Sequence, residues 1–110
     1  SSDPAFKAFE SMPWGYRAMF VLLHTYRVRN GCRTLREMIS RYAPPTENHT
    51  ENYIRAVATQ AQVSPDEALD TRNGNTMIPI VAAMSRVENG TPAQMDEVRA
   101  GWDLFVKYPV

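Results

Sequence analysis

The chain has 110 residues, of which 44% are hydrophobic and 22% charged, and its formal net charge is zero. These values are typical of a globular domain with a core of its own, and they exclude a disordered chain. The zero net charge gives no electrostatic reason to expect a nucleic acid or an anionic membrane as a partner. No apolar run is long enough to span a membrane, and a single cysteine, Cys32, excludes an internal disulfide.

Helix signals begin at the first residues. Asp3-Pro4 and Ser11-Met12-Pro13 each place a capping residue before a proline, and the second predicts a helix over residues 14–29. Asn30-Gly31 ends this helix, because glycine enters the left-handed conformation at little cost. Thr34-Leu35-Arg36-Glu37 is a capping box, which predicts a helix that ends near Tyr42.

The second half of the chain continues in the same way. Asn48 or Thr50 is expected to cap a helix that runs through about Gln62. Capping boxes at residues 64–67 and 91–94 predict a short helix toward residue 70 and a last helix through residue 105. Between them, the apolar residues 77–87 predict a helix that Asn89-Gly90 ends. We therefore expect one all-α domain over residues 1–110, a compact array of about six short helices.

Five arginines surround the predicted joint between the helix of residues 14–29 and the next one: Arg27, Arg29, Arg33, Arg36 and Arg41. This cluster has two interpretations, a local anion-binding patch and a solvated arginine face. Metal-ligand spacing is absent, because His24 and His49 are isolated from other ligands in sequence. The sequence has no glycine-rich phosphate loop either, so no cofactor or metal is expected.

The segment of residues 42–53 carries the most chemistry for a helix connection. Two prolines are followed by a carboxylate, an amide, an imidazole and a hydroxyl, at Glu47, Asn48, His49 and Thr50. Loops on a rigid helical scaffold are where binding and catalysis concentrate. A carboxylate in the first turn of a helix usually complements the helix dipole. Glu47 precedes the expected cap, so this explanation does not apply to it. It is therefore either a loop anchor or a site residue.

The order of several short motifs resembles phage- and prophage-encoded proteins of lysozyme-like type. The motifs are Phe6-x-x-Phe9-x-Ser11, Gly15-Tyr16-Arg17-Ala18, Leu22-Leu23, Tyr26, Asn30-Gly31, Thr34 and the run from Tyr42-Ala43-Pro44 to Tyr53-Ile54. The layout is also similar, less specifically, to autolysin-type glucosaminidases, where a tyrosine-containing loop lines the glycan cleft. Both resemblances cover residues 6–57.

The resemblance implies a lysozyme-like fold and a peptidoglycan glycan strand, or another phage protein, as partner, in a virion or at the bacterial cell envelope. On the comparison with the glucosaminidases, Tyr42, Ala43 and Tyr53 would occupy the positions of the cleft loop. No residue matches the family's catalytic glutamate by motif, so Glu47 is the candidate catalytic carboxylate by its position in this loop, and Tyr42, Asn48, Thr50 and Tyr53 are the candidates for sugar binding. The usual catalytic glutamate of such enzymes precedes the Phe-x-x-Phe segment. The chain would accordingly be the C-terminal part of a longer lysozyme-like domain.

A non-catalytic virion structural or interaction module is the alternative. In this interpretation Glu47 anchors the loop, Asn48 and Thr50 cap a helix, and Tyr53 and Trp14 belong to the core. Arg17 is expected to pair with a carboxylate, Glu10 or Glu47. The two interpretations differ in whether Tyr42, Glu47 and Tyr53 face one concave surface or point into packed helices.

Overall fold

Five helices make up the computed structural model, which describes residues 11–43 and 46–110 without the side chains of Glu47 and Asn48. They are α2 (Met12–Arg29), α3 (Leu35–Tyr42), α4 (Glu47–Ala61), α5 (Gly74–Asn89) and α6 (Met95–Lys107). No strand forms in these ranges, where Thr34 and Ala68 make an isolated antiparallel bridge. The all-α prediction is confirmed, with five helices in place of about six; the start signal at Asp3-Pro4 lies outside the described residues.

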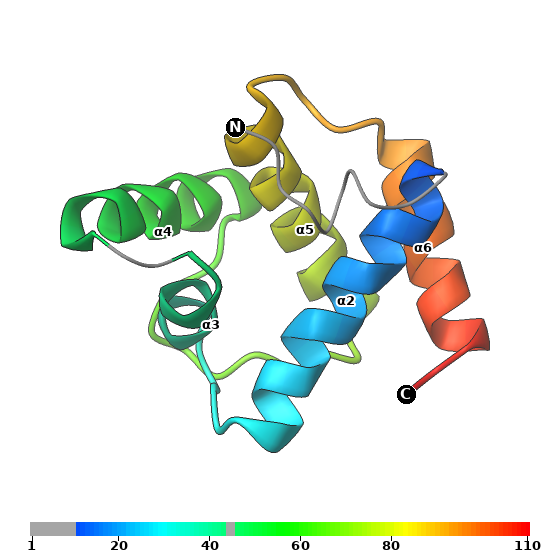
Figure 1. Ribbon diagram of the computed structural model, residues 1–110, viewed down its shortest axis with the longest axis horizontal. Helices are drawn as coiled ribbons and strands as arrows, with labels where there is room; N and C mark the ends of the chain where they lie inside the picture. The colour runs from blue at the N-terminus through cyan, green and yellow to red at the C-terminus, as the bar shows by residue number, and fades with distance from the viewer. Residues whose placement is uncertain (1–10, 44–45) are drawn as a thin grey trace.

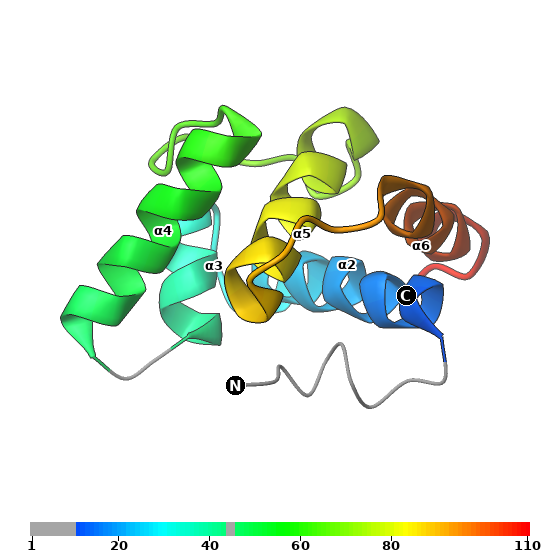
Figure 2. The same ribbon diagram turned by 90° about the horizontal axis from the view of Figure 1, so that it is seen from above.

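Helix α5 occupies the centre of the arrangement (Figures 1 and 2). α2 and α6 lie side by side and form the most extensive contact, and α4 packs against α5. The short α3 lies against α4 and also touches α2, while α5 contacts α4 on one side and α6 and α2 on the other. The radius of gyration is 12.6 Å, which is close to the value expected for a compact chain of this length.

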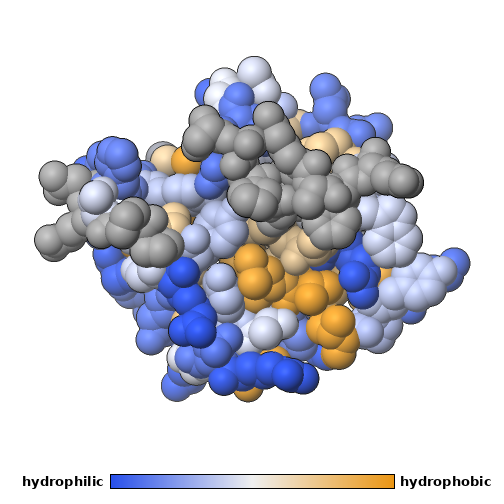
Figure 3. Space-filling model, viewed as in Figure 1, coloured by the Kyte–Doolittle hydropathy of each residue, from blue (hydrophilic) through white to orange (hydrophobic). Residues whose placement is uncertain are grey.

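Each helix contributes to one buried cluster, and α5 contributes most because it has neighbours on several sides. The largest fully buried side chains are Tyr16, Met19, Phe20, Leu23, Leu35, Met38, Ile39, Ile54, Val57, Met77, Ile80 and Met84. Helix α2 contributes Met19 and Leu23 to this cluster, and α4 contributes Ile54 and Val57. Helix α2 also carries apolar side chains on its outer side: Figure 3 shows hydrophobic residues exposed over its middle, and Val28 is 60% exposed.

Gly101 allows the close approach of α2 and α6. A Cβ atom at this position would lie 2.6 Å from Cβ of Tyr16 and 2.8 Å from the carbonyl oxygen of Pro13. Both distances are shorter than real carbon contacts, so the two helices require glycine here to pack at this separation.

Three of the predicted helix boundaries are confirmed by their geometry. Gly31 and Gly90 have φ of 69° and 75°, the left-handed conformation expected after α2 and α5. The capping box forms between Thr34 and Glu37, with the Glu37 N–H donating to Oγ1 of Thr34 and the Thr34 N–H to the Glu37 carboxylate. Cys32 is buried in the turn between α2 and α3, and its N–H donates to the carbonyl of Tyr26.

The short helix predicted from the capping box at residues 64–67 toward residue 70 is wrong. The segment is a turn, in which the N–H of Asp66 donates to Oγ of Ser64. The carbonyl of Pro65 accepts from the N–H of Arg36, and the N–H of Leu69 donates to the carbonyl of Arg33. These tertiary hydrogen bonds use backbone groups that a helix would need.

Two predicted caps are also wrong. Thr46 is the N-cap of α4. Asn48 and Thr50, the two alternatives predicted for this cap, therefore both lie inside the helix. Gln94, and not Thr91, precedes α6, which begins three residues later than the capping-box pattern indicates. Helix α5 begins earlier than predicted, at Gly74, because Oδ1 of Asn73 accepts from the N–H of Asn75 and caps it there.

Candidate functional site

The two tyrosines of the predicted sugar site pack against each other. Tyr53 of α4 is 9% exposed, and its hydroxyl lies 3.5 Å from the carbonyl of Met84 on α5, to which it donates. Tyr42, at the end of α3, is half-buried and meets the Tyr53 ring edge-on, with 6.3 Å between ring centroids. The pair therefore fills the space between α3, α4 and α5, as the structural interpretation of Tyr53 predicts.

Thr50 uses its hydroxyl inside the protein. Its Oγ1 donates to the carbonyl of Ala43 over 2.9 Å, across the connection between α3 and α4. The bond satisfies a carbonyl that follows the last turn of α3, which is a common need at helix ends. Thr50 thus ties the two ends of this connection together.

Glu47 and Asn48 lie in the first turn of α4 by their backbone positions. Their side chains fall outside the described residues, as do Pro44, Pro45 and Glu10. The catalytic role of Glu47 and the sugar-binding role of Asn48 therefore stay predictions.

Three of the five arginines near the α2–α3 joint turn to different partners. Arg36 is engaged by two carboxylates, with Nε 2.8 Å from Asp66 and Nη1 2.7 Å from Glu51. Those contacts raise the pKa of the Arg36 guanidinium, with the hydrogen bond to Asp66 as the largest cause. Arg41 lies over the ring of Tyr26, and Arg27 turns toward residues 68–72, where its Nε donates to the carbonyl of Leu69 over 3.3 Å.

Trp14 lies elsewhere than expected, and Arg17 lies beside it. The expected pairing of Arg17 with Glu10 or Glu47 stays a prediction, because those two side chains fall outside the described residues. Arg17 donates to the carbonyl of Tyr108 and places its guanidinium over the Trp14 ring. Trp14 is 43% exposed and stacks on Tyr108, so its prediction as a core residue is wrong. The packing of α6 beside α2 brings the end of the chain to this position.

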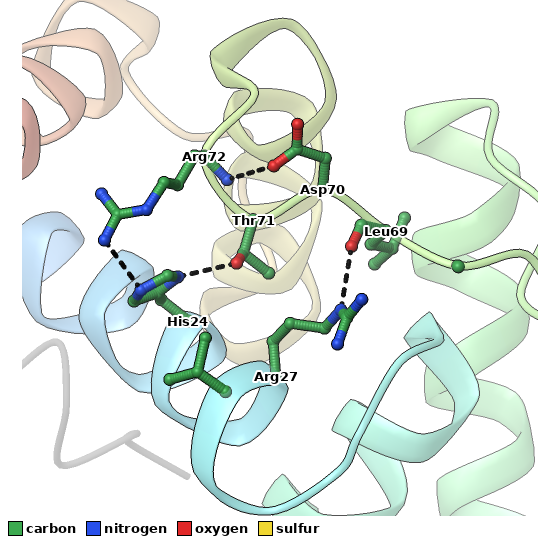
Figure 4. A pocket seen from close by; sticks show the side chains of 8 residues that line it. His24, Arg27, Leu69, Asp70, Thr71 and Arg72 are labelled. Atoms are coloured by element: carbon green, nitrogen blue, oxygen red, sulfur yellow. Dashed lines mark hydrogen bonds between the residues drawn. The ribbon is translucent and has the colours of Figure 1, made fainter.

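A pocket lies between the C-terminal half of α2 and residues 68–72, with a volume of about 490 Å³. His24 forms part of its lining and is 6% exposed. Its Nδ1 is 2.8 Å from Oγ1 of Thr71, and its Nε2 is 3.2 Å from Nη2 of Arg72 (Figure 4). Arginine can only donate, so Nε2 must accept, and Nδ1 carries the proton that is donated to Thr71.

The surroundings of His24 favour the neutral imidazole. Burial is the largest cause that lowers its pKa, and the positive charge of Arg72 lowers it further. The carboxylate of Asp70 acts in the opposite direction. From α6, the ring of Phe105 covers the imidazole edge-on at 5.8 Å. The pocket is therefore lined by two guanidinium groups, one carboxylate and a neutral histidine.

This pocket could not be recognised from the sequence, because its parts are far apart in the chain. His24 is 47 residues from Thr71 and 48 from Arg72. No spacing rule joins them. The cluster at Arg27 was the one signal in the sequence that pointed to this end of α2.

The described part of the chain places no three histidine, cysteine, aspartate or glutamate side chains where they could share a metal ion. In the same ranges, none of the helices combines the length and the apolar character that a membrane crossing requires.

Comparison with known proteins relates the chain to a phage protein. It is 36% identical over 102 residues to Protein P5 of Pseudoalteromonas phage PM2. The match covers 92% of this chain and 62% of the phage protein, so the chain spans less than two thirds of that relative's length. No protein-family model matches the chain. The phage part of the predicted resemblance is thereby confirmed, and its lysozyme-like part stays a prediction.

Proposed function

We propose that this chain is a non-catalytic interaction module of a phage-related protein, with another phage protein as its partner. The observation that carries the proposal is the position of Tyr53, which is packed against Tyr42 and bonded to α5. A residue that stacks on a sugar needs an accessible ring face, and Tyr53 has little exposed surface. Thr50 is likewise engaged with the Ala43 carbonyl.

Two further features support an interaction module. The match to a phage protein covers 92% of this chain. Helix α2 exposes hydrophobic side chains over its middle (Figure 3), with Val28 exposed near its end. Contiguous apolar surface on a small protein commonly marks a binding surface for another protein.

A peptidoglycan-acting domain of lysozyme-like type is the second candidate. Tyr42 favours it, because this residue is half-buried and ends α3, shortly before Glu47 begins α4 in the chain. In this proposal Glu47 supplies the carboxylate of the site, and Asn48 and Tyr42 contact the glycan. The chain would then be the C-terminal part of a longer lysozyme-like domain, as the resemblance implies.

Incubation of the pure protein with isolated peptidoglycan sacculi separates the two candidates. Released muropeptides are analysed by mass spectrometry, for the chain and for Glu47→Gln. The matched control is Glu67→Gln, which removes an exposed carboxylate outside the loop. We expect no release from any of the three proteins, because an interaction module has no acid placed over a glycosidic bond.

Reducing ends or anhydro sugars that disappear in Glu47→Gln and persist in Glu67→Gln would overturn the interaction module. Products that persist in both variants would overturn it as well and would direct the search for the acid to Glu10. The proposed partner is tested by chemical cross-linking. In a phage particle that contains this chain, we expect cross-links between α2 and another particle protein. Cross-links confined to the chain itself would contradict it.

A further inference from the structure

The turn between α2 and α3 contains the groups for a spontaneous covalent modification that neither candidate function requires. Asn-Gly pairs occur three times in the chain, at Asn30-Gly31, Asn73-Gly74 and Asn89-Gly90. In such a pair the backbone nitrogen of the glycine can attack the side-chain amide of the asparagine, because no glycine side chain hinders the approach. We propose that Asn30 is the asparagine at which this reaction occurs in the folded protein.

The reaction at Asn30 needs water and no other reactant. The backbone nitrogen of Gly31 bonds to Cγ of Asn30 and the Cγ–Nδ2 bond breaks, so that Nδ2 leaves as ammonia with the proton of the Gly31 N–H. The product is a cyclic succinimide. Water then opens the ring at either carbonyl carbon, which gives aspartate with a normal backbone, or isoaspartate, in which the main chain continues through Cγ. Both products carry a carboxylate where Asn30 was neutral.

The first argument is that the reacting groups of this pair are free. Asn30 and Gly31 are both exposed, and a Cβ atom at Gly31 would meet no atom within 4 Å. In the described part of the chain, neither the Asn30 side chain nor the Gly31 N–H makes a hydrogen bond. The carbonyl of Asn30 has only a weak contact, 3.9 Å from Sγ of Cys32. The peptide group between the two residues can therefore turn toward Cγ at little cost.

The second argument is that the pair at the end of α5 is held on both sides. Nδ2 of Asn89 donates to the carbonyl and to Oγ of Ser85, over 3.0 and 3.3 Å. The N–H of Gly90, which would have to attack, donates to the carbonyl of Arg86 over 2.8 Å. The reaction would break these bonds, so the helix end protects Asn89 although this residue is exposed.

The pair at the start of α5 is held in a different way. Oδ1 of Asn73 accepts from the N–H of Asn75 over 3.0 Å, and this bond caps the helix. Gly74 is the first residue of α5 and lies against the indole ring of Trp102, whose Nε1 would be 2.8 Å from a Cβ atom at Gly74. A turn of the peptide group between Asn73 and Gly74 would break the cap and disturb this packing.

The third argument is the charge around Asn30. Arg29 and Arg33 flank it, and no aspartate or glutamate occurs from residue 11 to residue 36. The next carboxylate, that of Glu37, already accepts from the N–H groups of Arg33 and Thr34. The glycine nitrogen attacks after it has lost its proton, and nearby positive charge favours this anionic form. The same cations stabilise the negative charge that develops on the amide oxygen during the attack.

Isoaspartate at position 30 would change the turn itself. It adds a carbon atom to the main chain between two hydrogen bonds, because the N–H groups of Asn30 and Cys32 both donate to the carbonyl of Tyr26. The two bonds cannot both keep their geometry when the chain between them becomes longer. We therefore expect the Cys32 amide to lose its protection after the modification.

Peptide mapping of the protein after incubation at pH 8 tests the site. Chymotrypsin is the protease of choice, because cleavage after Tyr26 and Leu35 leaves Asn30 inside one peptide. Mass spectrometry detects the replacement of the amide NH₂ by OH, and chromatography separates the aspartate and isoaspartate peptides. We expect Asn30 to be converted about tenfold or more faster than Asn73 and Asn89, because their reaction costs at least one hydrogen bond.

The same incubation in urea is the control for the local sequence. All three asparagines precede glycine, so in the unfolded chain they should be converted at similar rates. Asn30→Gln is the matched variant, since the longer side chain closes a ring far less readily. It should remove the conversion at position 30 and leave that of Asn73 and Asn89 as it is.

Hydrogen exchange of the Cys32 amide, followed by nuclear magnetic resonance, tests the effect on the turn. Exchange should be faster in protein converted to isoaspartate than in fresh protein. Asn30→Asp has the new charge on a normal backbone and should exchange at the rate of the fresh protein. Equal exchange in converted and fresh protein would contradict the expected change of the turn.

Either of two results would overturn the assignment of Asn30. One is conversion of Asn73 or Asn89 in the folded protein as fast as that of Asn30. The other is a folded protein in which Asn30 stays intact while all three asparagines are converted in urea, because the turn would then protect Asn30 as well.

Discussion

Nε2 of His24 accepts a hydrogen bond from the guanidinium group of Arg72, and this bond exists only while the imidazole is neutral. Protonation of His24 would place two positive charges in direct contact in a largely buried position. The pair therefore links the protonation state of His24 to the position of the Arg72 guanidinium group, which lines the pocket.

The stability of the protein should decrease when His24 is protonated. Burial and Arg72 lower its folded-state pKa below the ordinary value of 6.5. The unfolded chain then binds the proton more readily, so the stabilisation is complete above pH 6.5 and is lost as the pH falls through the folded-state pKa. Urea unfolding from pH 8 to pH 5 measures this for the protein and for His24→Gln. The difference between their free energies of unfolding should shrink at low pH.

His49→Gln is the control for this experiment, because His49 is exposed on the first turns of α4. It should leave the pH dependence of the protein as it is. A difference between the protein and His24→Gln that stays constant over the whole range would contradict the link between His24 and Arg72.

A second pH effect is expected at lower pH, from Glu37. Hydrogen bonds lower its pKa below 4.5, the largest contribution coming from the Arg33 N–H and a further one from that of Thr34. Its contribution to stability is complete above pH 4.5 and disappears as the pH falls through the lowered pKa. Glu37→Gln should therefore show a weaker acid dependence in urea unfolding. If the free energy of unfolding fell equally steeply with decreasing pH in the protein and in Glu37→Gln, the capping box would not depend on the charge of Glu37.

Gly101→Ala should destabilise the protein. Alanine is the better helix former, so local propensity alone would raise stability by up to about 1 kcal/mol. The added Cβ, however, would collide with Tyr16 and Pro13. We expect the clash to dominate and to cost about 1–3 kcal/mol net. An unchanged or raised midpoint in thermal unfolding would show that α2 and α6 move apart easily.

Thr50→Val should cost about 1 kcal/mol, since it removes the hydroxyl that donates to the Ala43 carbonyl and keeps the shape of the side chain. Thr50→Ser retains the hydroxyl and should recover most of that loss. Equal stability of the two variants in urea unfolding would indicate that the hydroxyl is not needed for folding, and would favour a role for Thr50 in ligand binding.

The helix content could be predicted from the sequence because caps and apolar spacing are local signals. The capping box at Thr34 and Glu37 and the glycines after α2 and α5 are such signals, and all were found where expected. The pattern at residues 64–67 is equally good by the same rules. It fails because Arg36 of α3 and Arg33, which precedes α3, make backbone hydrogen bonds to residues 65–69, and a local pattern contains no information about them.

The pocket could not be predicted for a related reason. Its composition depends on the packing of residues 68–72 against α2, which brings Thr71 and Arg72 to His24. The predicted loop site, in contrast, was read from neighbouring residues. Two of its five members, Thr50 and Tyr53, are bonded within the protein, and that competition for their polar atoms becomes visible only in three dimensions.

The reactivity of the buried Cys32 thiol can be used to measure local opening of the protein. Cys32 is the chain's single cysteine, it is 8% exposed, and it lies directly after the helix that carries His24 and Arg27. Because Cys32 is buried, a thiol reagent reaches its sulfur atom when the α2–α3 turn opens. The rate of the reaction therefore reports how often that turn opens. Because the thiol is the protein's own, the opening can be followed without any substitution.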